Sequence, residues 1–346
     1  MIDTSRIKAA VLKMFEVNFG LRPEERVVVV SDLPTFTDWR RKPAPHLNKM
    51  LAEAFLGRAV ADLVKEGYPD CPVEFVPYFS LGRSGLEPRP GLAARMARAR
   101  VLLAINSFSL SHTEARALAC RAGARVATMR GVIPEMFFPD GSIAADYLQI
   151  EADTKRWAER LTRAGQVRVA SPAGTDLVFS IENREGGVDT GLYLRPGQWG
   201  NLPAGEAFIA PLEGTGQGLV AVNPGWHAGL AEKLEIVIKD GLAREVRGGG
   251  EIGRRLIKLL GLDGRQKPRI ARCNLAEFGL GANPQARRTD ITIEAEKIKG
   301  TIHLALGDNA HLGGRVTADY HQDYVLDRPE VYLDGEKVIS AGQWLI

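Results

Sequence analysis

Cysteine is scarce in this sequence, and long apolar runs are missing. The three cysteines (Cys71, Cys120 and Cys273) are too few and too far apart for a disulfide framework or a cysteine-rich zinc site, and they fit a reducing cytoplasm. No apolar run approaches the ~20 residues that a membrane-spanning helix needs, and the N-terminus lacks the apolar core of a signal peptide. We therefore expect a soluble, cytoplasmic protein with no membrane partner.

Nucleotide-binding motifs and a strong excess of one charge are also absent. No G-x-G-x-x-G or P-loop pattern follows any predicted strand. The 346 residues carry 45 Lys and Arg against 42 Asp and Glu, a formal net charge of +3, and the two signs are interleaved. A basic nucleic-acid footprint is therefore not expected.

The first part of the chain alternates segments typical of helices with segments typical of buried strands. Strands that are apolar throughout and alternate with helices predict a parallel sheet covered on both faces. We therefore expect a doubly wound α/β scaffold domain over residues 1–165. Asp32, Asn106 and Arg130 fall at strand ends, where we interpret them as turn or capping residues. The predicted strands lie at 26–30, 73–78, 101–106 and 125–129, and the helices at 7–19, 47–66, 91–100 and 113–122.

The second part of the chain contains mainly short strand-like segments and few helices. A long amphipathic helix is predicted over residues 143–163 and would connect the two domains. Short strand-like segments separated by Gly, Pro and Asp turns follow it, with one further helix at 252–259. This pattern predicts a β-rich α+β domain over residues 166–346, in which we place the metal-binding site.

Residues 297–326 hold half of the six histidines and indicate a strand, a Gly-rich loop and a second strand. His303 lies in the first strand, His311 in the loop, and His321 and Asp323 in the second. Residues i and i+2 of a strand point to the same face, so His321 and Asp323 can converge on one point. Imidazole and carboxylate are the usual protein ligands of divalent zinc, manganese, cobalt or iron.

Two glutamates upstream have the same character. Glu206 follows a Pro and a Gly and enters a hydrophobic strand, and Glu277 lies between apolar residues before a Gly-rich turn. A carboxylate in such a place is costly to bury unless it is paired or binds a cation. With His303, His321 and Asp323 they make three carboxylates and two imidazoles, enough for two metal ions that share one carboxylate.

Four motifs in fixed order then resemble a known family. Asn-Leu-Pro-Ala-Gly-Glu (201–206), Asn-Leu-Ala-Glu-Phe-Gly-x-Gly-x-Asn-Pro (274–284), Gly-Thr-x-His-x-Ala-x-Gly (300–307) and His-x-Asp (321–323) are similar to the thermophilic aminopeptidases, the aminopeptidase T and aminopeptidase S group, in a short-loop branch. The resemblance implies a homodimeric metallopeptidase that hydrolyses N-terminal bonds of peptides or small amides. It implies two divalent ions, Zn, Co or Mn, with metal ligands at Glu206, Glu277, His303, His321 and Asp323.

Catalytic roles follow from that resemblance. A water activated by the metals would attack the scissile carbonyl. Glu277 or Glu206 would bridge the ions, and the less engaged carboxylate would move the proton. A tyrosine of the family, seven positions after the first metal histidine, falls on Ala310 here. His311 is the candidate substitute as donor to the oxyanion, and the alternative is a solvent-exposed loop histidine.

Two other functions stay open. A short-loop branch of the same superfamily resembles ring-cleaving dioxygenases of dihydroxypyridines, which use one Fe(II) and have a serine about where His303 stands. In that alternative, His303, His321 and one carboxylate would form a facial triad. A metal-stabilised binding protein would instead need a pocket closed to water and substrate. Because the sequence keeps the histidine and both glutamates, the aminopeptidase is the leading prediction.

Overall fold

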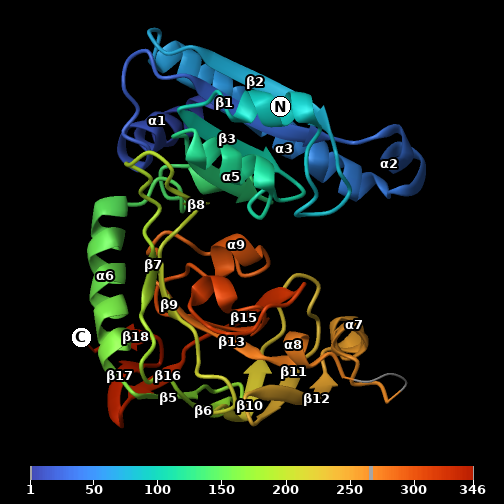
Figure 1. Ribbon diagram of the computed structural model, residues 1–346, viewed down its shortest axis with the longest axis vertical. Coiled ribbons are helices and arrows are strands. Elements are labelled where there is room, and N and C mark those ends of the chain that lie inside the picture. The colour runs from blue at the N-terminus through green and yellow to red at the C-terminus, as the bar shows by residue number, and fades with distance from the viewer. Residues whose placement is uncertain (1, 265–267, 346) are drawn as a thin grey trace. The chain divides into compact units, whose positions relative to one another are not determined.

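The computed structural model describes residues 2–264 and 268–345, and the chain forms two compact units (Figure 1). The first comprises residues 1–147 and 191–204, and the second comprises residues 148–190 and 205–346. A parallel-sheet α/β region and a β-rich region are both present, so the predicted fold class is confirmed at this level. Among the described residues, no helix has the length and apolar character needed to cross a membrane.

The first unit is built on a five-stranded sheet with strand order β2-β1-β3-β4-β8, in which every neighbouring pair is parallel. Its central strands are continuous apolar runs because both faces of the sheet are covered. The edge strand β8 comes from the segment 191–204, which returns to this unit after the second has begun. The strands are β1 Val27–Leu33, β2 Val73–Phe79, β3 Val101–Asn106, β4 Arg125–Arg130 and β8 Trp199–Asn201.

Helices cover the two faces of this sheet. Helices α4 (Pro90–Met96) and α5 (Glu114–Arg121) share an apolar cluster with alternate residues of the strands, among them Val28 and Leu102. Helix α3 (Ala44–Gly67) packs on the opposite face, where a Cβ on Gly57 would lie 2.1 Å from Ser31 Oγ. The other helical segments are α1 Thr4–Lys13, the π-helical turn Met14–Asn18, α2 Phe36–Arg41 and the 3-10 turn Pro134–Phe137.

A buried acidic pair ties α3 to the carboxyl edge of the sheet. The Asp32 carboxylate on β1 accepts a hydrogen bond of 2.8 Å from the backbone N–H of Ser107, which follows β3. The Ser107 hydroxyl donates in turn to Glu53 Oε2 on α3, and the Glu53 side chain is only 2% exposed. Burial is the main influence on the pKa of Glu53 and raises it from 4.5 to about 7.

This raised pKa predicts a pH-dependent stability. Between pH 4.5 and 7 the folded chain keeps a proton at Glu53 that the unfolded chain has released. Protonated Glu53 therefore contributes to the free energy of unfolding at low pH, and this contribution is lost as the pH rises through 7. Glu53→Gln should remove about 3 kcal/mol of the difference in unfolding free energy between pH 4.5 and pH 8. Urea unfolding at several pH values measures this difference.

The matched control is Glu66→Gln, an exposed position on the same helix. It should leave the pH profile of the wild type unchanged. A Glu53→Gln profile with the slope of the wild type would show that Glu53 is ionised in the folded chain at pH 5.

The second unit contains two antiparallel sheets and several helices. The larger sheet has the order β12-β11-β10-β6-β5-β16-β17-β18. Its strands are β5 Gln166–Ala170, β6 Asp176–Ser180, β10 Gln217–Val222, β11 Leu234–Lys239, β12 Leu242–Gly248, β16 Glu330–Leu333, β17 Glu336–Ser340 and β18 Gln343–Trp344. The helical segments are α6 Tyr147–Arg163, α7 Gly250–Leu260, α8 Ile270–Cys273, α9 Thr292–Ala295 and the 3-10 turn Ala310–Leu312.

The smaller sheet, with the order β15-β14-β13-β9-β7, positions the site. One face shares an apolar core with the larger sheet, where the rings of Phe278 and Phe179 lie 5.6 Å apart and Trp157 of α6 joins them. Because residues of a strand alternate between faces, every second residue of this sheet points away from that core. Its strands are β7 Gly187–Asp189, β9 Glu206–Ile209, β13 Leu275–Gly281, β14 Ile302–Gly307 and β15 His321–Leu326.

Candidate metal centre

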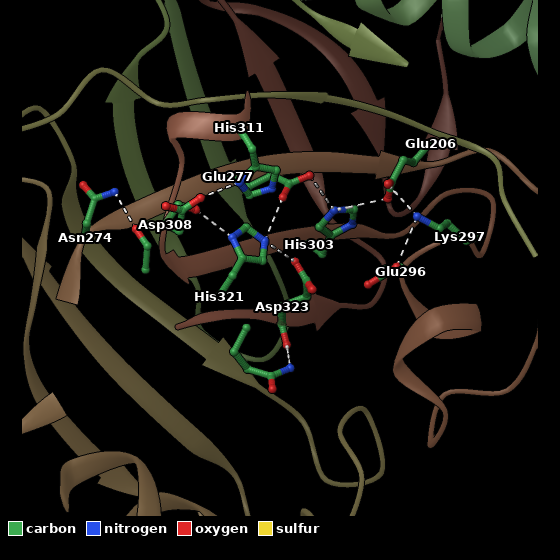
Figure 2. Close-up of polar contacts among 12 residues, drawn as sticks. Glu206, Asn274, Glu277, Glu296, Lys297, His303, Asp308, His311, His321 and Asp323 are labelled. Atoms are coloured by element: carbon green, nitrogen blue, oxygen red, sulfur yellow. Dashed lines mark hydrogen bonds and ion pairs between the residues drawn. The ribbon is translucent and has the colours of Figure 1, made fainter. Parts of the chain in front are cut away.

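The five predicted ligands lie on one face of the smaller sheet (Figure 2). Strands β14 and β15 pair antiparallel around the Gly-rich loop, which confirms the predicted hairpin. Glu277 and Asp323 both lie opposite Ala305, one on each side of β14, so the three form a row across neighbouring strands. His303 and His321 each lie two residues earlier on the same face, and Glu206 lies opposite Gly281. The five residues named from the motifs therefore lie together in one cluster.

Small residues beneath these side chains make the cluster possible. Gly279 lies opposite His303, and a Cβ on Gly279 would be 2.1 Å from the imidazole. A Cβ on Gly281 would be 2.2 Å from the backbone oxygen of Ile298. The alternation of Glu277, Gly279 and Gly281 along β13 thus leaves room on the site face. The Gly-rich turn predicted after Glu277 is therefore wrong, because Gly279 and Gly281 lie within β13.

One group of three side chains forms around His321. Its Nε2 is 3.1 Å from Glu277 Oε2 and 3.5 Å from Asp323 Oδ1. Its Nδ1 donates a 2.7 Å hydrogen bond to the backbone oxygen of Asp308, which directs Nε2 to the carboxylates. The side chains of His321 and Asp323 are 24% and 17% exposed, so part of the group is accessible to solvent. An oriented imidazole and two carboxylates whose ligand atoms lie within 4.8 Å of one another fit a divalent ion.

A second, more buried group forms around His303. Its Nε2 is 3.4 Å from Glu206 Oε2 and 3.5 Å from Glu277 Oε1. Glu277 belongs to both groups, with one oxygen facing each histidine. Glu206 Oε2 and His303 Nδ1 are buried and have no hydrogen-bond partner in the described part of the chain. The donor atoms of this group also suit a cation. The alternative prediction placed His303, His321 and one carboxylate in a single facial triad. In the structure, the two histidines belong to separate groups.

The carboxylates and imidazoles of the site shift one another's pKa values strongly. Burial favours the neutral form of His321, but hydrogen bonds with Asp323 and Glu277 outweigh it and raise the pKa of His321 to about 12. Burial is likewise the largest influence on Glu277, yet the two imidazoles hold the pKa of Glu277 well below its ordinary value. The pKa of His303 rises to about 9 because contacts with Glu277 and Glu206 outweigh its burial. A metal that binds here must therefore displace protons from the imidazoles.

A buried lysine that the sequence analysis did not single out completes the cluster. Lys297 Nζ lies 2.5 Å from Glu206 Oε1 and 3.1 Å from Glu296 Oε1, and the residue is 1% exposed (Figure 2). Burial raises the pKa of Glu206 and brings that of Glu296 to about 8, despite the lysine beside them. Lysine is almost never fully buried unless it is paired, so no property of its residue type predicted this position.

His311 lies at the edge of the site. Its ring is 5.2 Å from that of His321 and is nearly perpendicular to it. Its Nδ1 is 2.5 Å from Asp308 Oδ2, and its side chain is 44% exposed. The sequence therefore placed His311 correctly beside the ligands. Its role as an oxyanion donor was predicted only for a peptidase, so it depends on that hypothesis.

Comparison with known proteins shows the family. The profile described as NicX, 2,5-dihydroxypyridine 5,6-dioxygenase, matches residues 11–346. The chain belongs to the NicX family. A 2,5-dihydroxypyridine 5,6-dioxygenase of Pseudomonas putida is 24% identical over 270 residues, which cover 72% of this chain and 73% of that protein.

Two solved structures share the fold of this NicX-family chain. The structure of 2,5-dihydroxypyridine dioxygenase from Pseudomonas putida has a TM-score of 0.71 at 16% identity and covers 100% of this chain and 98% of its own. The structure of wild-type AmpT from Thermus thermophilus has a TM-score of 0.63 at 16% identity and covers 99% of each chain. At this identity, both likenesses concern the fold alone.

Membership of the NicX family corrects the leading prediction. The assignment to the thermophilic aminopeptidases is wrong, and so is the prediction of a hydrolase, protease or metallopeptidase. The family supports an enzyme, and it supports the dioxygenase alternative. The retained His303, Glu206 and Glu277 were taken to favour the peptidase, but carboxylate and imidazole bind zinc, cobalt and iron alike, so these residues do not distinguish the two activities. The homodimer and the cytoplasmic location stay predictions.

The close contact at Gly279 gives a test of the site geometry. Gly279→Ala would force the His303 ring from its place between Glu206 and Glu277, because the new methyl group and the ring cannot both fit. Overpacking of this kind lowers stability by about 2 kcal/mol. Urea unfolding measures the loss, and the chemical shifts of the His303 ring report its displacement.

Gly91→Ala on α4 is the matched control, because a Cβ there meets no atom within 4 Å. It should leave the stability unchanged or slightly higher, since alanine favours a helix. If Gly279→Ala behaved like this control, the position of His303 described above would be wrong.

Proposed function

We propose that this protein is a ring-cleaving dioxygenase of a dihydroxylated N-heterocycle, 2,5-dihydroxypyridine or a close analogue. The observation that carries the proposal is the match of the NicX profile to residues 11–346. The relative from Pseudomonas putida carries the name of the same activity. A dioxygenase adds both atoms of O2 to its substrate, so the proposed ring opening needs no external reductant.

A single divalent iron would be held by Glu277, His321 and Asp323. The peptidase hypothesis implied two zinc, cobalt or manganese ions, whereas the dioxygenase alternative implied one Fe(II). The group around His321 supports the single ion because its imidazole is oriented and its two carboxylates converge. When bound, iron supplies the redox chemistry that allows O2 to react with an organic ring.

The surrounding residues orient this group. The backbone oxygen of Asp308 fixes the His321 ring with Nε2 toward the carboxylates. His303 Nε2 lies between Glu206 Oε2 and Glu277 Oε1, and its contact with Glu277 Oε1 leaves Oε2 facing His321. The partial exposure of His321 and Asp323 leaves an approach for substrate and O2. This opening argues against a closed, purely structural metal site.

The proposal predicts oxygen uptake with the named substrate. Protein loaded anaerobically with Fe(II) should consume one O2 for each 2,5-dihydroxypyridine, measured with an oxygen electrode and by loss of the ring absorbance. His321→Ala should lower this rate more than about 100-fold, because changing even a residue that supports a ligand costs 10- to 100-fold.

His46→Gln on α3 of the first unit serves as the histidine control and should retain the wild-type rate. Hydrolysis of aminoacyl substrates without oxygen uptake would contradict the proposal. So would undiminished oxygen uptake by His321→Ala.

A further inference from the structure

The second group of potential ligands is built against a fixed positive charge. Lys297 is one of the largest fully buried side chains of the described residues. Its Nζ lies 2.5 Å from Glu206 Oε1, 3.1 Å from Glu296 Oε1 and 3.5 Å from Asp189 Oδ2. An ammonium group can be buried only when it is paired in this way. Glu206 therefore has one oxygen on the lysine and the other directed to His303.

The backbone holds Lys297 in this position. Its carbonyl oxygen accepts a 2.8 Å hydrogen bond from the N–H of Asn283, and its own N–H donates a 3.0 Å hydrogen bond to the oxygen of Glu294. The next residue, Ile298, forms a β-bridge with Asn283. Asn283 follows β13, the strand that carries Glu277, so the lysine is anchored to the same scaffold as the ligands.

We propose that Lys297 is an internal cation that restricts this centre to one metal ion. A divalent ion bound by Glu206, Glu277 and His303 would lie beside the ammonium group already paired with Glu206. Like charges repel strongly in a buried site, where solvent and salt screen them little. Among the described contacts, no residue of the group around His321 pairs with Lys297, so an ion bound there lies farther from the ammonium group and is repelled less.

This inference rests on the proposed function, which uses a single ion. It explains why carboxylates and imidazoles that could hold two ions would hold only one. Paired ions a few ångströms apart serve hydrolysis by activating water between them. A site with one ion and a fixed lysine lacks that arrangement. Lys297 thus acts as a specificity-determining residue, through the number of ions, without needing to contact the substrate.

The test counts metal ions in Lys297→Met, which removes the charge and keeps most of the side-chain volume. Chelator-treated protein is titrated with Co2+ and Zn2+, and the bound ions are counted by elemental analysis and calorimetry. We expect one ion per chain in the wild type and two in Lys297→Met. Adding Glu206→Gln to Lys297→Met should return the count to one.

The matched control is Lys299→Met, two residues away, where a 38% exposed lysine pairs with Asp153. It should keep one ion per chain. A folded Lys297→Met protein that still takes up one ion at saturation would overturn the inference.

Glu206→Gln alone tests the inference if Lys297→Met does not fold. The inference places Glu206 outside the working metal site, so this variant should keep one ion per chain. Loss of that ion would overturn the inference. Two ions in an oxygen-consuming wild type would overturn it but leave the proposed function in place, whereas one ion without oxygen uptake would count against the proposed function alone.

Discussion

The cost of burying carboxylates governs the design of this centre. Four carboxylates lie on or beside one face of the smaller sheet and are largely excluded from water: Glu206, Glu277, Glu296 and Asp323. Such a set is stable only if cations or protons lie among the carboxylates. The chain supplies Lys297 at one end and two imidazoles in the middle. At the exposed end, around His321 and Asp323, the proposed iron would add further positive charge.

The clustering of the five predicted ligands could be anticipated where the geometry is local or depends on a simple period. His321 and Asp323 share a face because they are two residues apart on a strand. The hairpin around His311 follows from apolar alternation interrupted by glycines. Glu206 was conspicuous because it enters a hydrophobic strand, and Glu277 because it lies between apolar residues. The strand register that brings these segments together depends on long-range pairing, for which a single sequence has no periodic signal.

Other features could not be found in this way. Strand β8 has three residues and pairs with β4 across about seventy positions of sequence, too short for any hydrophobic pattern. Lys297 belongs to a Lys-Ile-Lys segment that looks like an ordinary polar turn, although one lysine is buried and the other is exposed. The chemistry itself was misassigned because imidazole and carboxylate ligands serve several divalent metals, and a single sequence does not show which reaction a bound metal supports.

Anomalous diffraction from crystals of the iron-loaded protein, recorded at the iron absorption edge, tests the central claim most directly. The account predicts one iron peak per chain, bounded by Glu277, His321 and Asp323, with the Lys297 ammonium group still on Glu206. A second iron between Glu206 and His303, or a single iron there with none beside His321, would contradict it.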